Sequence, residues 1–111
     1  MAYTLCTEAE ALLAIGQNAG AAQILTANTT IWVNMAEGLI SSEVDYDVVT
    51  NYASFTTWQK EVLKVAATSM AAMIGINQNQ NSWQLATAQS KLNVLDYLYY
   101  KSIEQIRKFT A

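Results

Sequence analysis

The chain has 111 residues, of which 52% are hydrophobic and only 14% are charged, and its formal net charge at pH 7 is −3. It contains no histidine and one cysteine, Cys6, which excludes Ser-His-Asp and Cys-His nucleophile systems, ordinary structural zinc sites and an intrachain disulfide. A net acidic chain is not a general nucleic-acid binder.

The N-terminal half of the sequence predicts two helices. Residues 7–10, Thr-Glu-Ala-Glu, have the spacing of a capping box, so a first helix should begin at Thr7 after an N-terminal extension over residues 1–6. Glycines at positions 16 and 20 should end it. A second helix is predicted over about residues 22–42, where apolar side chains recur at steps of three and four. Asn28 is an alternative start, because Asn and Thr are poor helix formers.

The middle of the sequence predicts a loop and a third helix. Residues 43–55 contain Asp and Asn at positions that suit turns, and we allow for an extended piece within this loop. Residues 56–59, Thr-Thr-Trp-Gln, offer a second capping box, so the third helix should start at Thr56 or Thr57. Between Lys64 and Ile76 no charged residue appears, which predicts a helix buried on most sides.

The C-terminal region predicts a polar turn over residues 77–81 and then a long fourth helix. This helix should be capped by Ser82 and run from Trp83 to about Lys108, because its apolar residues follow a heptad seam. It would be roughly 39 Å long at 1.5 Å per residue, and so overhang a domain of this size. The expected fold is therefore all-α: one helical domain over residues 1–111, with four helices, the last of them long.

Charge is unevenly distributed along the chain. Residues 1–59 carry six acidic and no basic residues, whereas residues 60–111 carry six basic and three acidic ones. A subunit with one acidic and one basic end can stack head to tail with copies of itself. The alternative is chance placement of 15 charges. Likewise, the weakly charged, amide-rich composition suits either a subunit that buries much of its surface or a monomer with a polar coat.

Few residues offer chemistry. Glu43, Asp45 and Asp47 form the only acidic cluster, and on an extended strand they could face one side and bind a divalent cation. They lack the glycine and closing glutamate of a calcium loop, however, so a solvated loop is the preferred interpretation. No glycine-rich phosphate loop is present. We therefore predict no metal site, no cofactor and no catalytic residue, and expect Cys6 to be an inert apolar side chain.

The fourth predicted helix carries the candidate interaction residues. Tyr97, Tyr99 and Tyr100 face several sides of one helix, so some of them should contact a partner; ordinary exposure of the phenol tips is the alternative. Lys91, Lys101 and Lys108 lie within about 100° of one another around the helix. They are either a solvated face or, repeated around a ring, the lining of a channel that conducts DNA without reading its sequence.

A family resemblance adds to these inferences. Its segments, in chain order, are residues 2–5 (Ala-Tyr-Thr-Leu) and 7–9 (Thr-Glu-Ala), Trp32 with Ala36-Glu37 and Ile40, Tyr46-Asp47 with Tyr52-Ala53, residues 60–63 (Lys-Glu-Val-Leu) and 71–74 (Ala-Ala-Met-Ile), and Ala88 with residues 92–95 (Leu-Asn-Val-Leu). Together they span most of the chain, and their order resembles that of the small helical head–tail adaptor (connector, or neck) proteins of tailed bacteriophages. The loop over residues 43–55 is acidic here, where such chains can carry basic residues.

The resemblance implies a structural virion protein in the neck of the particle, assembled in the host cytoplasm. It implies a homo-oligomeric ring of twelve subunits beneath the portal protein, which continues the DNA channel and joins the tail or a stopper protein. It also implies that the C-terminal segment docks on the portal. The docking residues would be Tyr97, Tyr99, Tyr100, Ile103, Ile106 and Phe109.

The sequence leaves two other functions open. The first is a small cytoplasmic interaction or regulatory module that binds a partner helix through the tyrosine-rich helix. The second is a minor carboxylate enzyme, disfavoured because histidine and phosphate loops are absent. We expect no membrane association, because the longest uncharged apolar stretch, residues 65–76, is too short to cross a bilayer.

Overall fold

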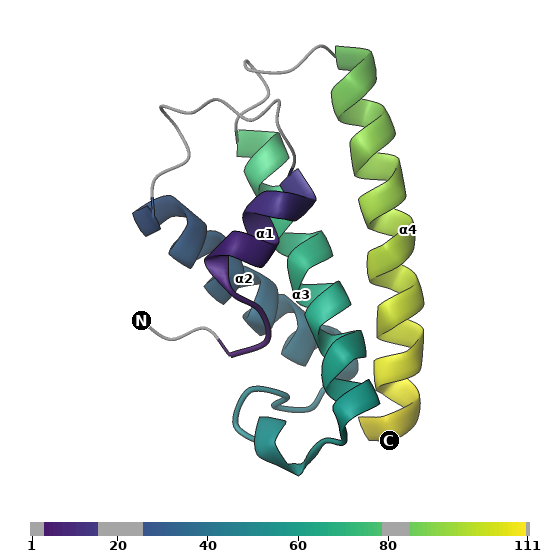
Figure 1. The fold of residues 1–111 in the computed structure, drawn as a ribbon. Coiled ribbons are helices and arrows are strands. Elements are labelled where there is room, and N and C mark those ends of the chain that lie inside the picture. The colour runs from purple at the N-terminus through teal and green to yellow at the C-terminus, as the bar shows by residue number, and fades with distance from the viewer. Residues whose placement is uncertain (1–3, 16–25, 79–84, 111) are drawn as a thin grey trace.

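The computed structural model describes residues 4–15, 26–78 and 85–110, and all regular structure in these ranges is helical. The elements are α1 (Glu8–Ile15), α2 (Thr26–Val44), the short 3-10 helix η2 (Tyr52–Ser54), α3 (Thr57–Gln78) and α4 (Leu85–Thr110). The predicted all-α fold with a long last helix is confirmed for this part of the chain (Figure 1).

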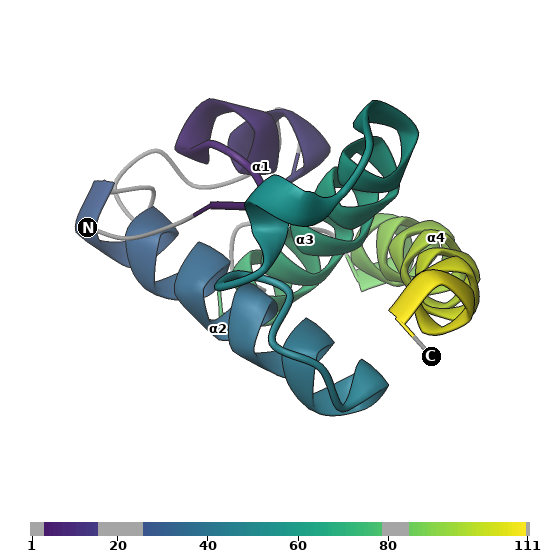
Figure 2. The same cartoon turned by 90° about the horizontal axis from the view of Figure 1, so that it is seen from below.

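Helix α3 is the centre of the molecule. It runs antiparallel to α4 on one side and contacts α1 and α2 on the other, and its most extensive packing is with α4 (Figures 1 and 2). Its alanines at positions 66, 67, 71 and 72 are fully buried, and such small side chains let the neighbouring helices approach closely. The prediction that this uncharged segment is buried on most sides is confirmed.

The core is built from one face of each surrounding helix. Its largest fully buried apolar side chains are Trp32, Val33 and Ile40 of α2, Leu63 and Ile76 of α3, Ile103 and Ile106 of α4, and Leu5 and Val48 of the connecting segments. Removal of this apolar surface from water is the main force that holds the helices together.

Local capping determines where the helices begin. The Thr7 amide donates to Glu10 Oε1 at 2.8 Å and the Glu10 amide donates to Thr7 Oγ1 at 3.1 Å, so the predicted capping box is confirmed. Helix α3 begins at Thr57, where the Thr56 amide donates to Gln59 Oε1 at 2.9 Å. These ends were predictable because their hydrogen bonds join residues three apart.

Helix α2 ends with a 6→1 hydrogen bond from the Tyr46 amide to the Ser41 carbonyl, at 3.1 Å. Asp45 takes the left-handed conformation between them, with φ of 53°. The chain beyond turns and forms η2, so the extended piece allowed for in the loop over residues 43–55 was wrong. The reason is local: the Asp47 carboxylate accepts from the Thr50 amide and hydroxyl at 3.0 and 2.7 Å, which closes a turn.

Several predicted boundaries moved. Helix α2 already includes Thr26, two residues before the alternative start at Asn28, and α4 continues to Thr110. Helix α3 extends to Gln78, so residues 77 and 78, predicted as the start of a polar turn, are helical instead. The predicted ends at Gly16 and Gly20, the start at residue 22, the rest of the turn and the cap at Ser82 lie outside the described residues.

Candidate interaction surface

Five of the six predicted docking residues on α4 fall into two groups. Tyr97 and Tyr100 are exposed, at 63% and 54% of their surface. Tyr99, Ile103 and Ile106 instead lie in the core, at 2% exposure or less, so docking through these three is not available in this conformation. The reason is their spacing: steps of four and three place them on the side of α4 that packs onto the other helices.

Phe109, the sixth docking residue, is partly buried in a chain of aromatic contacts at the C-terminal end of α4. Its ring centroid lies 5.4 Å from that of Phe55 and 5.6 Å from that of Trp58, both edge to face. The Phe55 ring in turn lies 6.2 Å from that of Tyr46. These contacts hold the end of α4 against the loop and the start of α3.

Tyr99 carries a buried hydroxyl with no hydrogen-bond partner among the described residues. Burial, together with the negative charge of Glu43 and the neighbouring Tyr100, raises the pKa of Tyr99 to about 12. The phenol therefore stays protonated at neutral pH and acts as part of the packing.

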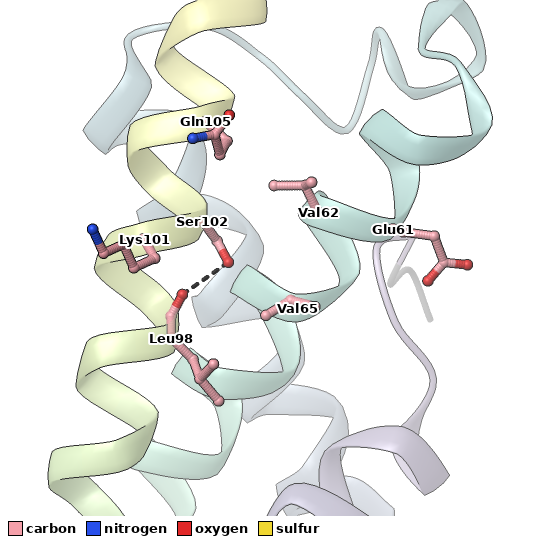
Figure 3. Close-up of a pocket in the computed structure, with 7 residues that line it drawn as sticks. All are labelled: Glu61, Val62, Val65, Leu98, Lys101, Ser102 and Gln105. Atoms are coloured by element: carbon pink, nitrogen blue, oxygen red, sulfur yellow. Dashed lines mark hydrogen bonds between the residues drawn. The ribbon is translucent and has the colours of Figure 1, made fainter.

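A shallow groove of about 270 Å³ runs along the outside of the α3–α4 pair (Figure 3). Val62 and Val65 extend toward it from α3, and Leu98 lines it from α4. The Ser102 hydroxyl is satisfied within its own helix, because it donates to the Leu98 carbonyl at 2.8 Å. The groove floor is therefore apolar. We call this surface the α3–α4 groove.

Charged side chains stand at the two rims of the α3–α4 groove. Lys101 lies on the α4 rim and Glu61 on the α3 rim, and in Figure 3 both point away from its floor. The Lys101 ammonium also lies 5.8 Å from the centre of the Tyr97 ring. An apolar floor with opposite charges at its edges is the composition of a protein-binding surface.

The three lysines predicted to line a channel share this side of the molecule. Lys101 and Lys108 are exposed, whereas Lys91 is partly buried. On the same arc of α4 lie exposed apolar side chains, at Val94, Tyr97 and Leu98. The basic stripe is thus interleaved with apolar groups, and its channel role stays a prediction.

A second apolar surface lies on the outside of α2. Ile31, Met35 and Leu39, spaced four residues apart, are each exposed over 42% or more of their surface. Gly38 lies beside them, and a Cβ atom added there would meet nothing within 4 Å. We call these four residues the α2 stripe.

The α2 stripe and the α3–α4 groove face different sides of the molecule. The opposite face of α2 is buried against the core, and α3 lies between α2 and α4 (Figure 2). Met35 and Leu39 belong to the apolar residues that recur at steps of three and four in this helix, but they lie on its exposed side. The apolar positions of α2 cover an arc that is too wide for one buried face. The width of this arc is the feature of the sequence that indicates exposed apolar residues on this helix.

Glu37 is the buried carboxylate of α2, and no structural role was predicted for it from the sequence. It is 4% exposed, and it accepts hydrogen bonds from the Thr4 and Leu5 amides, the latter at 2.6 Å. Its contacts tie the N-terminal segment to α2 and help to bury Leu5 and Cys6. Burial, with Glu10 and Glu37 nearby, raises the pKa of the Cys6 thiol to about 12, so the thiol is a poor nucleophile.

The predicted acidic cluster, in which Glu43 lies in α2 and Asp45 and Asp47 follow it, does not converge on one point. Glu43 pairs with Arg107 of α4 at 3.0 Å, and Asp47 closes its own turn. Within the described ranges, no group of three or more potential ligands could hold a metal ion. In the same ranges, no helix is long and apolar enough to span a bilayer.

Comparison of the chain with protein-family models, with curated proteins and with solved structures finds no match.

Proposed function

We propose that this chain is a structural subunit that assembles with further copies of itself. The carrying observation is the pair of exposed apolar surfaces, the α2 stripe and the α3–α4 groove, on different sides of one small domain. Contiguous exposed apolar surface on a soluble domain marks interaction sites. Two different surfaces favour head-to-tail contacts, which generate closed rings or filaments rather than two-fold dimers.

In its specific form, the proposal is a head–tail connector ring in the neck of a tailed bacteriophage, and it rests on the resemblance in sequence described above. Portal and tail or stopper proteins would then be its neighbours. Tyr97 and Tyr100 are exposed and accessible to such a neighbour. Lys101 and Lys108 are exposed and would face DNA if α4 lined the channel.

A second candidate is a small interaction module that binds a helix of another protein. The observation in its favour is the α3–α4 groove, whose apolar floor and charged rims suit an amphipathic helix laid between two others. This module would be monomeric by itself and would need only one of the two exposed surfaces.

Native mass spectrometry of the purified chain, followed by negative-stain imaging with and without a portal protein, separates the two. We expect higher oligomers and ring-shaped particles that sit on the portal. A monomer that ignores the portal and captures an amphipathic helix would instead support the second candidate. Filaments or rings that fail to bind a portal would keep the assembly role and remove the phage neck assignment.

A further inference from the structure

The α2 stripe is an exposed apolar row on one helix, and the α3–α4 groove is an exposed apolar depression between two helices. Ile31, Met35 and Leu39 form a ridge of the i, i+4 type, and ridges of this type pack into the grooves of neighbouring helices. The α3–α4 groove is an apolar depression between two antiparallel helices, and the α2 stripe of another molecule laid along it would bury both apolar surfaces. No segment among the described residues covers either surface.

Gly38 fits a close approach of another helix to the α2 stripe. A glycine inside a helix destabilises that helix relative to alanine. Nothing inside the described part of the chain requires this one, because a Cβ atom at Gly38 would enter open space. A partner helix packed beside Met35 and Leu39 would use that space.

The charges beside the two surfaces favour a second copy of this chain as the partner, and they favour one relative orientation of the two helices. Asp45 and Asp47 follow the end of α2 and form no ion pair with the described residues, and α2 itself carries no basic residue. Lys101 and Lys108 lie on the groove side of α4 and are exposed. A second copy of this chain therefore supplies the complementary charge for each surface.

The distance from the α2 stripe to the end of α2 is close to the distance between two points on the groove side of α4. At 1.5 Å per residue, Ile31 and the end of α2 are about 20 Å apart, and Val94 and Lys108 are about 21 Å apart. With α2 of one copy parallel to α4 of the next, Ile31 beside Val94 brings the two aspartates beside Lys108, which is exposed. The opposite direction would leave them beside Lys91, which is partly buried.

We propose that the α2 stripe of one copy docks in the α3–α4 groove of the next, with the two helices parallel. This inference rests on the self-assembly proposed above and names its interface. Because the two surfaces differ, each copy offers one donor and one acceptor surface, and the contact repeats head to tail.

The test pairs two variants that each lose one surface. Met35→Glu places a charge in the α2 stripe, and Leu98→Glu places one in the α3–α4 groove. Both side chains are exposed, so both variants should fold, which circular dichroism and thermal unfolding check. Each variant alone should stay monomeric in sedimentation velocity. An equimolar mixture should form a 1:1 dimer and nothing larger, because one intact stripe meets one intact groove.

Asn93→Glu is the matched control. It adds the same charge to an exposed position on another side of α4, and it should assemble like the unaltered chain.

Charge reversal supplies a second measurement. Asp47→Lys alone or Lys108→Glu alone should weaken association about tenfold, because each places like charges across the contact. Asp47→Lys also removes the acceptor of the Thr50 amide and hydroxyl, so circular dichroism and thermal unfolding first check that this variant folds. An equimolar mixture of these two variants should recover the association, since the new lysine of one then meets the new glutamate of the other.

The outcomes separate the interface from the proposed function. Self-association of the Leu98→Glu variant alone, or a Met35→Glu and Leu98→Glu mixture that stays monomeric while the unaltered chain assembles, overturns the interface and leaves the assembly role standing. An unaltered chain that is monomeric at every concentration overturns both.

Discussion

Glu37 and Glu43, six residues apart in α2, each connect a distant part of the chain to this helix, but Glu37 is buried and Glu43 is exposed. Glu37 is buried and binds backbone amides of the N-terminal segment, 32 and 33 residues away. Glu43 is exposed and binds Arg107, 64 residues away, through Nη at 3.0 Å. Both carboxylates tie distant parts of the chain to α2, but only the first does so away from water.

The difference in burial decides how much each contact stabilises the fold. Removing one partner of a buried hydrogen bond leaves the other partner desolvated and unpaired, whereas an exposed ion pair exchanges its partner for water. The N-terminal segment should therefore depend strongly on its contact with Glu37. The Glu43 contact should add little to the free energy of unfolding and should fade with salt.

The largest effect is expected for Glu37→Ala. The Thr4 and Leu5 amides would lose their acceptor, and the packing of Leu5 and Cys6 would loosen. We expect a loss of about 2 kcal/mol in the free energy of unfolding, because the Leu5 amide is buried and an unsatisfied buried amide costs about 1–3 kcal/mol, whereas Thr4 is exposed. Urea denaturation measures it, and hydrogen exchange should report faster exchange at the Leu5 amide.

Glu37→Gln is the matched variant for this prediction. Its side-chain carbonyl keeps the shape and one acceptor oxygen, so we expect it to lose only about 1 kcal/mol. Equal stability of the Ala variant and the unaltered chain would show that the N-terminal segment contributes nothing to the fold.

Sequence reasoning succeeded where the determining contacts are local. The capping box at Thr7 joins residues three apart, and the burial of α3 follows from its lack of charge after Lys64. The all-α fold follows from periodicity, which the absence of proline leaves uninterrupted. Such features need no knowledge of which helices meet.

Sequence reasoning missed what depends on tertiary neighbours. Glu37 reads as an ordinary polar position of an amphipathic helix, because its partners are amides more than thirty residues away. Tyr97 and Tyr99 are two residues apart, yet one is exposed and the other is in the core. Which tyrosines stay exposed depends on how α4 is rotated against α3, and periodicity fixes that rotation only to within a wide arc.

Glu10 is a third carboxylate with partners, the Thr7 amide and Lys64. The contribution of its charge to the free energy of unfolding should depend on pH. The hydrogen bond from the Thr7 amide, with the ion pair to Lys64 at 3.3 Å, lowers the pKa of Glu10. A lowered carboxyl pKa stabilises the fold above the pKa of the unfolded chain, and this contribution is lost as pH falls through the folded value. Glu10→Gln should cost about 0.5 kcal/mol at pH 7.

At a pH below the folded pKa of Glu10, the cost of Glu10→Gln should shrink toward zero, since Glu10 is then protonated in both the folded and the unfolded chain. Urea denaturation of the variant and the unaltered chain at the two pH values measures this. Thr7→Val, which removes the capping hydroxyl but no charge, is the control, and its cost should change little with pH. A Glu10→Gln cost that stays constant with pH would mean that the charge of Glu10 does not contribute.

The smallest effect is expected for the exposed pair. In a double-mutant cycle of Glu43→Gln and Arg107→Gln, the coupling energy should be about 0.5 kcal/mol or less at low salt and should disappear at about 1 M salt. Arg107 also donates to the Glu43 carbonyl at 3.3 Å, and this contact survives the first substitution, so the cycle isolates the carboxylate alone. A coupling above about 2 kcal/mol that persists in salt would place this pair in the same class as Glu37, and burial would no longer explain the difference between the two carboxylates.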